Sequence, residues 1–371
     1  MSNSSMEFVV GLDLSDKKIT VCVVDDAGAV VRRETVANDQ TGVIAALADF
    51  PAPARVTVAL ETGTHARWVS QLVKSLGFRV LVGDARQLRL IWAADNKQDV
   101  RDAELLARIA RFDPKLLNPV TLRGEAVHLD LAAVKARDAL VGSRTKLVNC
   151  VRGMLKSAGV ALPSGSTAAF SRMVQEHNTE PLLWPAINPL LAVLTTLTPQ
   201  IREFDRYLEH LGETKYPQTT RLRQVTGVGP LTALAYVLTL ESPERFAKSR
   251  DVGPYLGLVP RRDQSGESDK PLSITKAGNP YLRRLLVNNA AYILGPFGPD
   301  CDLRRHGERL ARRGGAVAKR KARVATARKL AVLLHHLWRT GETYEPLRHG
   351  PNKALPEPPP TTIKEELTTQ R

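Results

Sequence analysis

The sequence predicts an α/β sheet at its N-terminal end, followed by mostly α-helical structure. Two observations support this prediction. Short apolar segments, separated by turn signals and helical stretches, occupy residues 8–85, as expected for strands of a sheet. Beyond residue 122, apolar residues recur at spacings of four and three, which is typical of packed helices.

The sheet is predicted from three consecutive strands and two further ones. The segment "FVVGLDLSDKKITVCVVDDAGAVVRRETVAND" contains three short apolar runs, with "DDAG" as a turn. Two further strands, "RVTVALETG" and "RVLVGDA", each follow a helical stretch, at residues 42–50 and 65–77. Three antiparallel strands followed by alternating helix and strand indicate a ribonuclease-H-like sheet. A helix is expected next, in "NKQDVRDAELLARIARF".

Two long helices are expected in the middle of the chain. Apolar residues alternate spacings of four and three from Leu190 to Leu211, and an earlier helix repeats this pattern from Leu129 to Met154. Joined through the stretch near 159–188, the two helices would form an antiparallel hairpin or a dimer seam. The uncharged residues 181–201 are therefore assigned to a packed coiled coil and not to a membrane span.

Four parts of the chain are expected from these patterns. They are an α/β catalytic domain at 1–120, a helical coiled-coil region at 121–215, a largely helical domain with Gly-rich joints at 216–345, and a disordered Pro-rich tail at 346–371.

The charge favours an anionic polymer as the partner. The chain has 43% hydrophobic and 25% charged residues, as in soluble globular proteins, and a formal net charge of +15. Residues 1–112 hold 14 basic and 14 acidic residues, whereas residues 304–329 hold 11 basic residues against Glu308 alone. The three cysteines form no CxxC pair and the N-terminus lacks a basic n-region, so a reducing cytoplasm is expected.

Four acidic residues of the N-terminal part are candidates for a metal site. Asp13 lies inside the apolar strand "VVGLDLS", and Glu61 ends the strand "VALE". A carboxylate within an apolar strand is costly unless it is paired or binds a cation. Asp99 and Asp102 are three residues apart on a predicted helix and share a face. If the fold brings the four together they would hold Mg²⁺; otherwise Asp13 merely ends a strand and the helical pair is solvated.

The stretch "PRRDQSGESDK" raises the question of what Ser265 does. Ser-Gly in a polar loop is commonly a simple turn. However, the surrounding cations could bind a phosphodiester and stabilise its transition state; they are Arg261, Arg262, Lys270 and Lys276. No histidine lies nearby in sequence as a general base, so a nucleophilic Ser265 would need assistance from a metal or an arginine. The residues alone leave both roles open.

Two further segments are candidates for nucleic-acid binding. "TGVGPLTA" resembles the second half of a helix-hairpin-helix, whose backbone N–H groups bind phosphate, although a plain packing joint has the same pattern. The basic C-terminal stretch favours phosphate contact with salt-dependent affinity. The complete candidate set is Gly227, Gly229, Arg261, Arg262, Lys270, Lys276, Arg283, Arg284, Lys319, Arg320, Lys321 and Arg323.

Together, these motifs resemble the DEDD-type insertion-sequence transposases, which are bridge-RNA-guided recombinases. "GLDLSDKK", "ALETGTH" and "NKQDVRDAELLA" are similar to the acidic motifs of that family. "QVTGVGPLTA", "FAKSRDVGPYLGLVPRRDQSGES" and "ITKAGNPYLRRLL" are similar to its C-terminal transposase domain. The resemblance covers most of the chain and leaves out the Pro-rich tail. It implies a RuvC-like N-terminal domain, a coiled-coil insertion and a transposase domain.

The resemblance also implies roles for individual residues. Asp13, Glu61, Asp99 and Asp102 would bind Mg²⁺, and Ser265 would be the nucleophile that forms a covalent phosphoserine link. The site would be composite, in a homo-oligomer such as a dimer or tetramer. The implied partners are donor and target double-stranded DNA and a structured non-coding guide RNA, in the bacterial cytoplasm and at the nucleoid during action, with no membrane.

Three other functions match parts of the sequence. A structure-specific nuclease of the Holliday-junction-resolvase type would use water as its nucleophile and form no covalent protein–DNA adduct. A sugar-kinase-like phosphotransferase also begins with a Gly-x-Asp strand, but no second phosphate-binding Gly/Asp motif is found. A non-catalytic nucleic-acid binder with a decayed acidic site is disfavoured by the intact set of four carboxylates.

Overall fold

The chain forms two compact units, residues 1–123 and residues 124–371. The computed structural model describes residues 7–86, 88, 99–177, 181–265 and 268–348. Of the predicted tail at 346–371, residues 349–371 lie outside the described residues.

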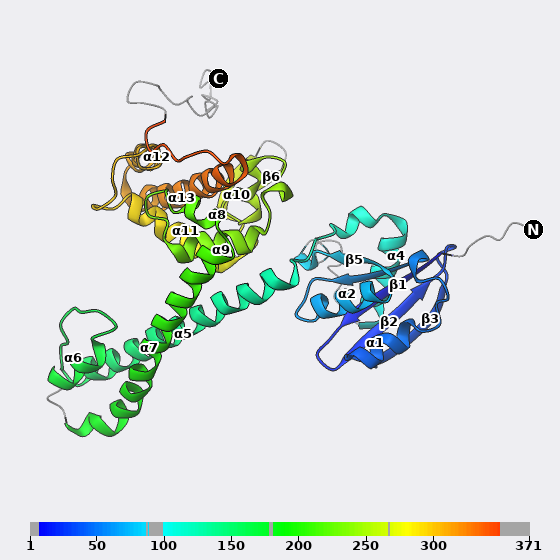
Figure 1. The fold of residues 1–371 in the computed structure, drawn as a ribbon, viewed down its shortest axis with the longest axis horizontal. Coiled ribbons are helices and arrows are strands. Elements are labelled where there is room, and N and C mark those ends of the chain that lie inside the picture. The colour runs from blue at the N-terminus through cyan, green and yellow to red at the C-terminus, as the bar shows by residue number, and fades with distance from the viewer. Residues whose placement is uncertain (1–6, 87, 89–98, 178–180, 266–267, 349–371) are drawn as a thin grey trace, which may run out of the picture. The chain divides into compact units, whose positions relative to one another are not determined.

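The first unit is built on a five-stranded sheet with the strand order β3-β2-β1-β4-β5 (Figure 1). β1 pairs antiparallel with β2, which pairs antiparallel with β3, whereas β4 is parallel to both β1 and β5. The strands are β1 (Phe8–Leu14), β2 (Lys18–Val24), β3 (Val30–Ala37), β4 (Val56–Glu61) and β5 (Arg79–Gly83). The predicted mixed α/β sheet, with its three antiparallel strands first, is confirmed.

Helices cover both faces of this sheet. On one face, α1 (Gln40–Leu47) and α2 (Ala66–Ser75) share a buried core with the strand residues Val10, Leu12, Val58 and Leu60. On the other face, α4 (Asp99–Phe112) buries Ala103 and Ala107 against Cys22 and Val24 of β2. Two short 3₁₀ turns, η1 (Pro53–Arg55) and η2 (Pro114–Leu117), complete the described elements of this unit. Side chains alternate between faces along a strand, so Gly11 and Asp13 lie on the α4 side.

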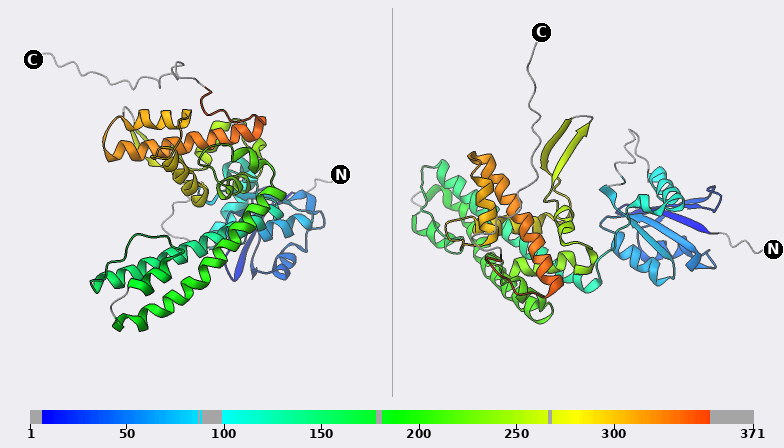
Figure 2. Two further views of the ribbon diagram at one scale, coloured as in Figure 1. Left: turned by 60° about the vertical axis from the view of Figure 1, so that its left-hand side comes forward. Right: turned by 90° about the horizontal axis from the view of Figure 1, so that it is seen from above.

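In the second unit, two long helices form an antiparallel arm. They are α5 (Glu125–Ser157) and α7 (Trp184–Thr214), with α6 (Phe170–His177) and the turn η3 (Pro181–Leu183) at the far end (Figures 1 and 2). Val148 and Leu194 share the core at the far end of the arm, while Val134 and Leu208 belong to the core at its base.

The segment Pro181–Thr214 is long and apolar enough to cross a membrane, judged by length and composition only. Its buried residues Leu191 and Leu194 pack in the same core as Val148 and Val151 of α5. The seam predicted on α5 from Leu129 to Met154 is wrong in register: Leu129 is 61% exposed, and α5 buries Leu131 instead.

The remainder of the second unit is a helical body around the buried helix α9. All residues of α9 from Thr232 to Leu240 are buried, and the Tyr236 hydroxyl donates to the Ala331 carbonyl at 2.6 Å. The helices and 3₁₀ turns of this body are α8 (Gln218–Leu222), α9 (Pro230–Leu240), η4 (Pro243–Arg245), η5 (Ser249–Asp251), α10 (Val252–Tyr255), α11 (Pro280–Ile293), α12 (Asp302–Ala311) and α13 (Gly315–Thr340).

The segment around Ser265 differs from the prediction. The expected polar loop is an antiparallel hairpin of β6 (Pro260–Ser265) and β7 (Ser268–Ile274), which projects from the helices (Figure 2). Polar and charged residues occupy most of both strands, so the strands carry no alternating apolar pattern. Backbone hydrogen bonds between the strands satisfy the polar groups of the chain, and such pairing does not depend on an apolar face.

Candidate active site

Asp13 and Glu61 lie at corresponding positions on two neighbouring parallel strands. β1 and β4 pair from Phe8 with Val56 up to Leu12 with Leu60, and the two acidic residues follow immediately on each strand. Leu12 and Leu60 are buried in the core beneath α1 and α2, so Asp13 and Glu61 point to the opposite face, which α4 covers. Both carboxylates are half-buried there.

Helix α4 lies directly on the backbone of β1. A Cβ atom at Gly11, two residues before Asp13, would collide with the carbonyl oxygen of Ala103 and lie 2.8 Å from the Ala107 amide nitrogen. Any residue larger than glycine would therefore push strand and helix apart. Because Gly11 and Asp13 share a face, Asp13 lies at the surface on which α4 rests.

The direction of α4 brings its first turn to the same end of the sheet. Near the end of the helix, Arg108 donates to the Gly28 carbonyl at 3.2 Å and Arg111 to the Asp26 carbonyl at 3.1 Å. Both acceptors lie in the β2–β3 turn, at the end where β1 begins. The helix therefore runs antiparallel to β1, and it begins at Asp99, near the end of β1 that carries Asp13. From Gly11 to Asp13 the strand rises by about 6.6 Å, which equals the rise of about four helical residues.

The fold thus brings Asp13, Glu61 and the first turn of α4, with Asp102, to one end of the sheet. Asp102 is half-buried, and the backbone of Asp99 opens the helix, but the Asp99 side chain lies outside the described part. Among the described side chains, no three of His, Cys, Asp or Glu are arranged to hold a metal ion. The donor type nevertheless suits Mg²⁺, because half-buried carboxylate oxygens are the hard ligands it takes.

Two residues at the same end of the sheet were missed in the sequence. His65 follows β4, and its Nδ1 accepts from Trp68 Nε1 at 3.2 Å, so its proton resides on Nε2, 3.3 Å from Asp16 Oδ1. Asp84 follows Gly83, which pairs with Glu61, and Asp84 Oδ1 accepts the backbone N–H of Arg86 at 3.0 Å. Both residues come after strands, β4 and β5, that end here, and this position after a strand is the signal in the sequence that could have found them.

Ser265 is the last residue of β6 and lies opposite Ser268 of β7. Its side chain and that of Lys270 lie outside the described side chains, whereas Arg261, Arg262 and Lys276 are exposed. The hairpin belongs to the second unit and the carboxylates belong to the first.

The two glycines of "TGVGP" have different environments. Gly227 has a φ of +87°, and a Cβ atom there would lie 3.0 Å from Cδ1 of Tyr292 on α11. Gly229 is the N-cap of α9, and nothing lies within 4 Å of a Cβ atom built there. Gly227 therefore serves the packing of the turn, while the start of α9 at Gly229 leaves room for an approaching group.

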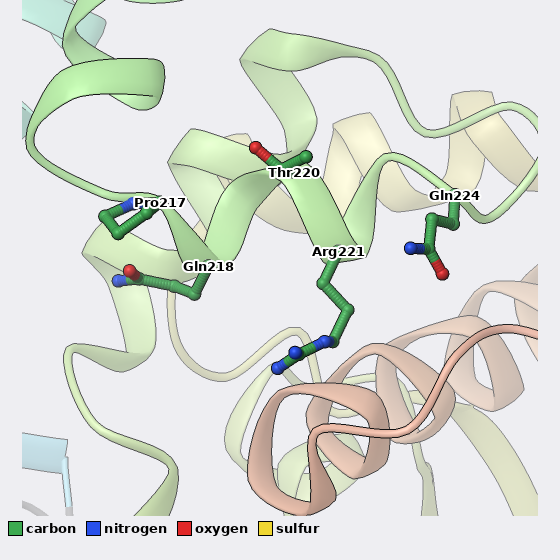
Figure 3. Close-up of a pocket in the computed structure, with 5 residues that line it drawn as sticks. All are labelled: Pro217, Gln218, Thr220, Arg221 and Gln224. Carbon is green, nitrogen blue, oxygen red and sulfur yellow. The ribbon is translucent and has the colours of Figure 1, made fainter.

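An open depression of the surface lies on helix α8 (Figure 3). Its volume is about 420 Å³. The lining residues are Pro217, Gln218, Thr220, Arg221 and Gln224. In Figure 3, the side chains of Arg221 and Gln224 point downward in the view, and that of Gln218 points to the left. These amide and guanidinium groups supply donors for phosphate or base oxygens.

The charged residues of α13 are all basic, and many of them are exposed. The helix contains no acidic residue, and its exposed cations include Lys319, Arg320, Lys321 and Arg323. On α12, in contrast, Arg304 pairs with Glu308 at 2.7 Å, and Arg305 pairs with Asp300 at 2.6 Å.

Two candidate arginines of α11 are engaged by the protein itself. Arg283 Nη1 donates to the carbonyl oxygens of Leu256 and Ala277, at 3.0 and 2.5 Å. Arg284 pairs with Asp138 of α5, and its guanidinium lies 5.1 Å from the centre of the Tyr281 ring.

Comparisons with known families show which family the chain belongs to. Residues 10–159 match the model of the DEDD-type IS110 transposases, described as a transposase, and residues 219–298 match the transposase IS116/IS110/IS902 family. The chain belongs to this family of insertion-sequence transposases. It is therefore an enzyme that cleaves DNA and transfers strands.

Individual relatives give the same result. The chain is 32% identical to the transposase for insertion sequence element IS1328 of Yersinia enterocolitica over 237 residues, which cover 63% of this chain and 69% of the relative. It is 26% identical to the transposase for element IS1111A of Coxiella burnetii, over 77% of this chain and 78% of the relative. A probable family 20 transposase of Pseudomonas aeruginosa is 29% identical over 77% of this chain and 83% of its own length.

Proposed function

We propose that this transposase carries out RNA-guided cleavage and exchange of DNA strands, with a carboxylate cluster that holds Mg²⁺ and with Ser265 as the nucleophile. The observation that carries the proposal is the meeting of Asp13 and Glu61, on adjacent parallel strands, with the start of α4 at one end of the sheet. The likeness of the quoted motifs to guided recombinases supports the RNA partner.

The metal ligands would be Asp13, Glu61, Asp99 and Asp102. Bound Mg²⁺ supplies stabilisation of the negative charge that develops on the phosphoryl oxygens. The task of the four carboxylates is to fix the ion at the end of the sheet, where α4 keeps the strand ends partly shielded from water.

In the proposed step, Ser265 Oγ forms a bond to phosphorus while the bond from phosphorus to one deoxyribose oxygen breaks. The hydroxyl proton of Ser265 is transferred, in net terms, to the departing oxygen, so one phosphodiester replaces another and its bond energy is kept for rejoining. The exposed cations Arg261 and Arg262 on β6 would bind phosphates of the DNA backbone and offset their charge.

The proposed active site is composite, because the carboxylates and the serine belong to different units of the chain. Completing it requires that the two units meet on the DNA, within one copy or between copies of a homo-oligomer. Exchange between donor and target DNA needs several such sites, so a dimer or a tetramer is the expected working form.

The test of the nucleophile combines purified protein, Mg²⁺, RNA transcribed from the flanking DNA, and end-labelled donor and target duplexes. On a denaturing gel, the wild type should give DNA that migrates with protein, and Ser265→Ala should not. Ser268→Ala is the matched control, because Ser268 is the cross-strand neighbour of Ser265 and should keep the adduct. Clean cutting without any adduct would favour the water-using nuclease instead.

The same assay tests the carboxylates. Asp13→Asn should abolish cleavage and leave DNA binding intact, whereas Asp26→Asn, in the turn at the opposite end of the sheet, should cleave normally. Normal cleavage by Asp13→Asn would contradict the proposed metal site.

A further inference from the structure

The base of the β6–β7 hairpin is a crossing of two backbone segments. Gly257 precedes β6 and Gly278 follows β7, and both have a φ of +66°. A Cβ atom at Gly257 would lie 2.6 Å from the Ala277 carbonyl oxygen, and one at Gly278 would collide with the carbonyl oxygen of Tyr255. The two segments therefore touch without side chains between them, which only glycine allows at these positions.

Hydrogen bonds join the same two segments. The N–H of Thr275 donates to the Val259 carbonyl at 2.9 Å, and the N–H of Lys276 donates to the Gly257 carbonyl at 3.2 Å. The ladder of the hairpin thus continues into its base.

Arg283 of α11 clasps both segments at once. Its Nη1 donates to the carbonyl of Leu256, before β6, at 3.0 Å and to the carbonyl of Ala277, after β7, at 2.5 Å. The start of α11 is itself anchored, because Asn279 caps it by accepting from Tyr281 N at 2.9 Å and donates to Thr239 of α9 at 3.3 Å. Both bonds leave the same Nη1, whose two N–H groups have fixed directions in the guanidinium plane, whereas the three N–H groups of a lysine ammonium rotate about the Cε–Nζ bond.

We infer that Arg283 is a positioning residue for strand transfer: it fixes the direction of the hairpin that carries Ser265, and it does so through the backbone carbonyls of Leu256 and Ala277. The inference rests on the proposed role of Ser265. It assigns Arg283 a different task from the nucleic-acid contact that its position in the basic sequence predicts.

The geometry of the hairpin explains why its base matters. A two-stranded hairpin is marginally stable alone, and this one exposes Arg261, Arg262 and Leu272 to solvent. Its direction therefore depends on the base. β6 spans about 20 Å, so a rotation of about 3° at the base moves its last residue, Ser265, by about 1 Å. A displacement of this size in a reacting group costs about a hundredfold in rate.

The test compares Arg283→Lys and Arg283→Ala with the control Arg250→Ala, which removes one exposed positive charge from the same unit. Three quantities are measured: the rate of adduct formation at saturating DNA, the Kd for duplex DNA with its salt dependence, and hydrogen exchange at the amides of Thr275 and Lys276. We expect both Arg283 variants to form adduct at least tenfold more slowly and to exchange these amides faster. Their Kd should stay within twofold of the wild type, and Arg250→Ala should match the wild type throughout.

Two results would overturn the inference. A weaker Kd, with a salt slope reduced by about 0.9 and unchanged hydrogen exchange, would make Arg283 a phosphate contact. A wild-type rate in Arg283→Lys would show that the fixed N–H groups of the guanidinium are not needed. If Arg283→Ala does not fold, Arg283→Lys carries the same test.

The exchange measurement is independent of the chemistry at Ser265. Suppose that the amides of Thr275 and Lys276 exchange faster in the Arg283 variants, while Ser265→Ala still forms the adduct. The role of Arg283 in holding the hairpin would then stand, and the serine mechanism would be wrong. Unchanged exchange of these amides, together with an inactive Ser265→Ala, would support the serine mechanism and contradict the role of Arg283.

Discussion

Gly11 of β1 lies against Ala103 of α4 so closely that a Cβ atom at Gly11 would overlap the Ala103 carbonyl oxygen. This contact joins two backbones, so no side chain can rotate to make room. It lies two residues before Asp13 on the strand and four residues after Asp99, where the helix begins. The close approach therefore sets the spacing between the strand and the helix that carry the proposed metal ligands.

Gly11→Ala should destabilise the first unit and weaken DNA cleavage. Overpacking a core usually costs about 1–3 kcal/mol, and a collision with backbone atoms lies at the upper end of that range. Gly63→Ala is the control, since nothing lies within 4 Å of a Cβ atom at Gly63. Thermal unfolding of both variants checks the prediction. An unchanged Tm for Gly11→Ala would show that α4 can move away without cost.

The sheet could be predicted because its signals are local. The apolar runs at Phe8–Leu14 and Lys18–Val24 are interrupted by a charged turn, and the carboxylate of Asp13 stands out within an apolar strand. The parallel register that places Asp13 beside Glu61 is set by packing between segments far apart in the chain. That register has no local signal, so the residue pattern alone indicates each carboxylate as a candidate ligand but does not predict that they meet.

The hairpin around Ser265 could not be predicted, because its strands carry no local signal in the sequence. Strand prediction relies on alternating apolar residues, and "RRDQS" and "SDKPLSI" lack them. What holds these strands is the backbone ladder and the crossing at Gly257 and Gly278, together with the clasp by Arg283. In the sequence, Arg283 and Arg284 are two adjacent basic residues with nothing to distinguish them. Only the tertiary structure shows that Arg283 bonds to backbone carbonyls and Arg284 to Asp138.

Asp130 should be important for the stability of the arm. This buried residue of α5, 8% exposed, accepts from Lys215 Nζ at 2.6 Å and from the Tyr216 hydroxyl at 2.5 Å, and so ties the start of α5 to the end of α7. Burial, together with the hydrogen bond to Asp130, raises the pKa of Tyr216, so its hydroxyl remains a donor at neutral pH. Asp130→Ala leaves both donors without their acceptor and should cost about 3 kcal/mol.

Urea unfolding measures this effect, with Asp205→Ala as the control. Asp205 also joins the two helices, through Arg137 at 2.9 Å, but its side chain is 45% exposed. A pair in contact with water should contribute less than about 1 kcal/mol. Equal losses in the two variants would contradict the special role of Asp130.

His306 should make the stability of the second unit depend on pH. Burial, together with the nearby cations Lys329 and Arg309, lowers the pKa of this half-buried imidazole from 6.5 to about 4. Between these values the unfolded chain binds the proton and the folded chain does not, so stability is present above pH 6.5 and is lost as the pH falls towards 4. After allowance for solvent screening, the loss should be about 1–2 kcal/mol.

Replacing His306 should remove this pH dependence. His306→Asn should lose less stability than the wild type between pH 7.5 and pH 4.5, as measured by urea unfolding at both pH values. His210→Asn, at an exposed position of α7, is the control and should follow the wild type. The same acid loss in His306→Asn and wild type would show that other groups cause it.

The exposed cations of α13 should account for much of the salt dependence of DNA binding. Lys319 and Arg323 are four residues apart, a spacing at which like charges destabilise a helix, and α13 offers no acidic residue to offset them. Phosphates of a nucleic acid would offset this repulsion, and each phosphate contact adds about 0.9 to the slope of log K against log salt. The double variant Lys319→Gln, Arg323→Gln should therefore reduce the slope by about 2 units.

The double variant Arg55→Gln, Lys74→Gln is the control. It removes two exposed charges from the first unit and should leave the slope unchanged. Equal slopes for the two double variants would place the DNA elsewhere on the protein, since an effect of net charge alone would not distinguish the two units.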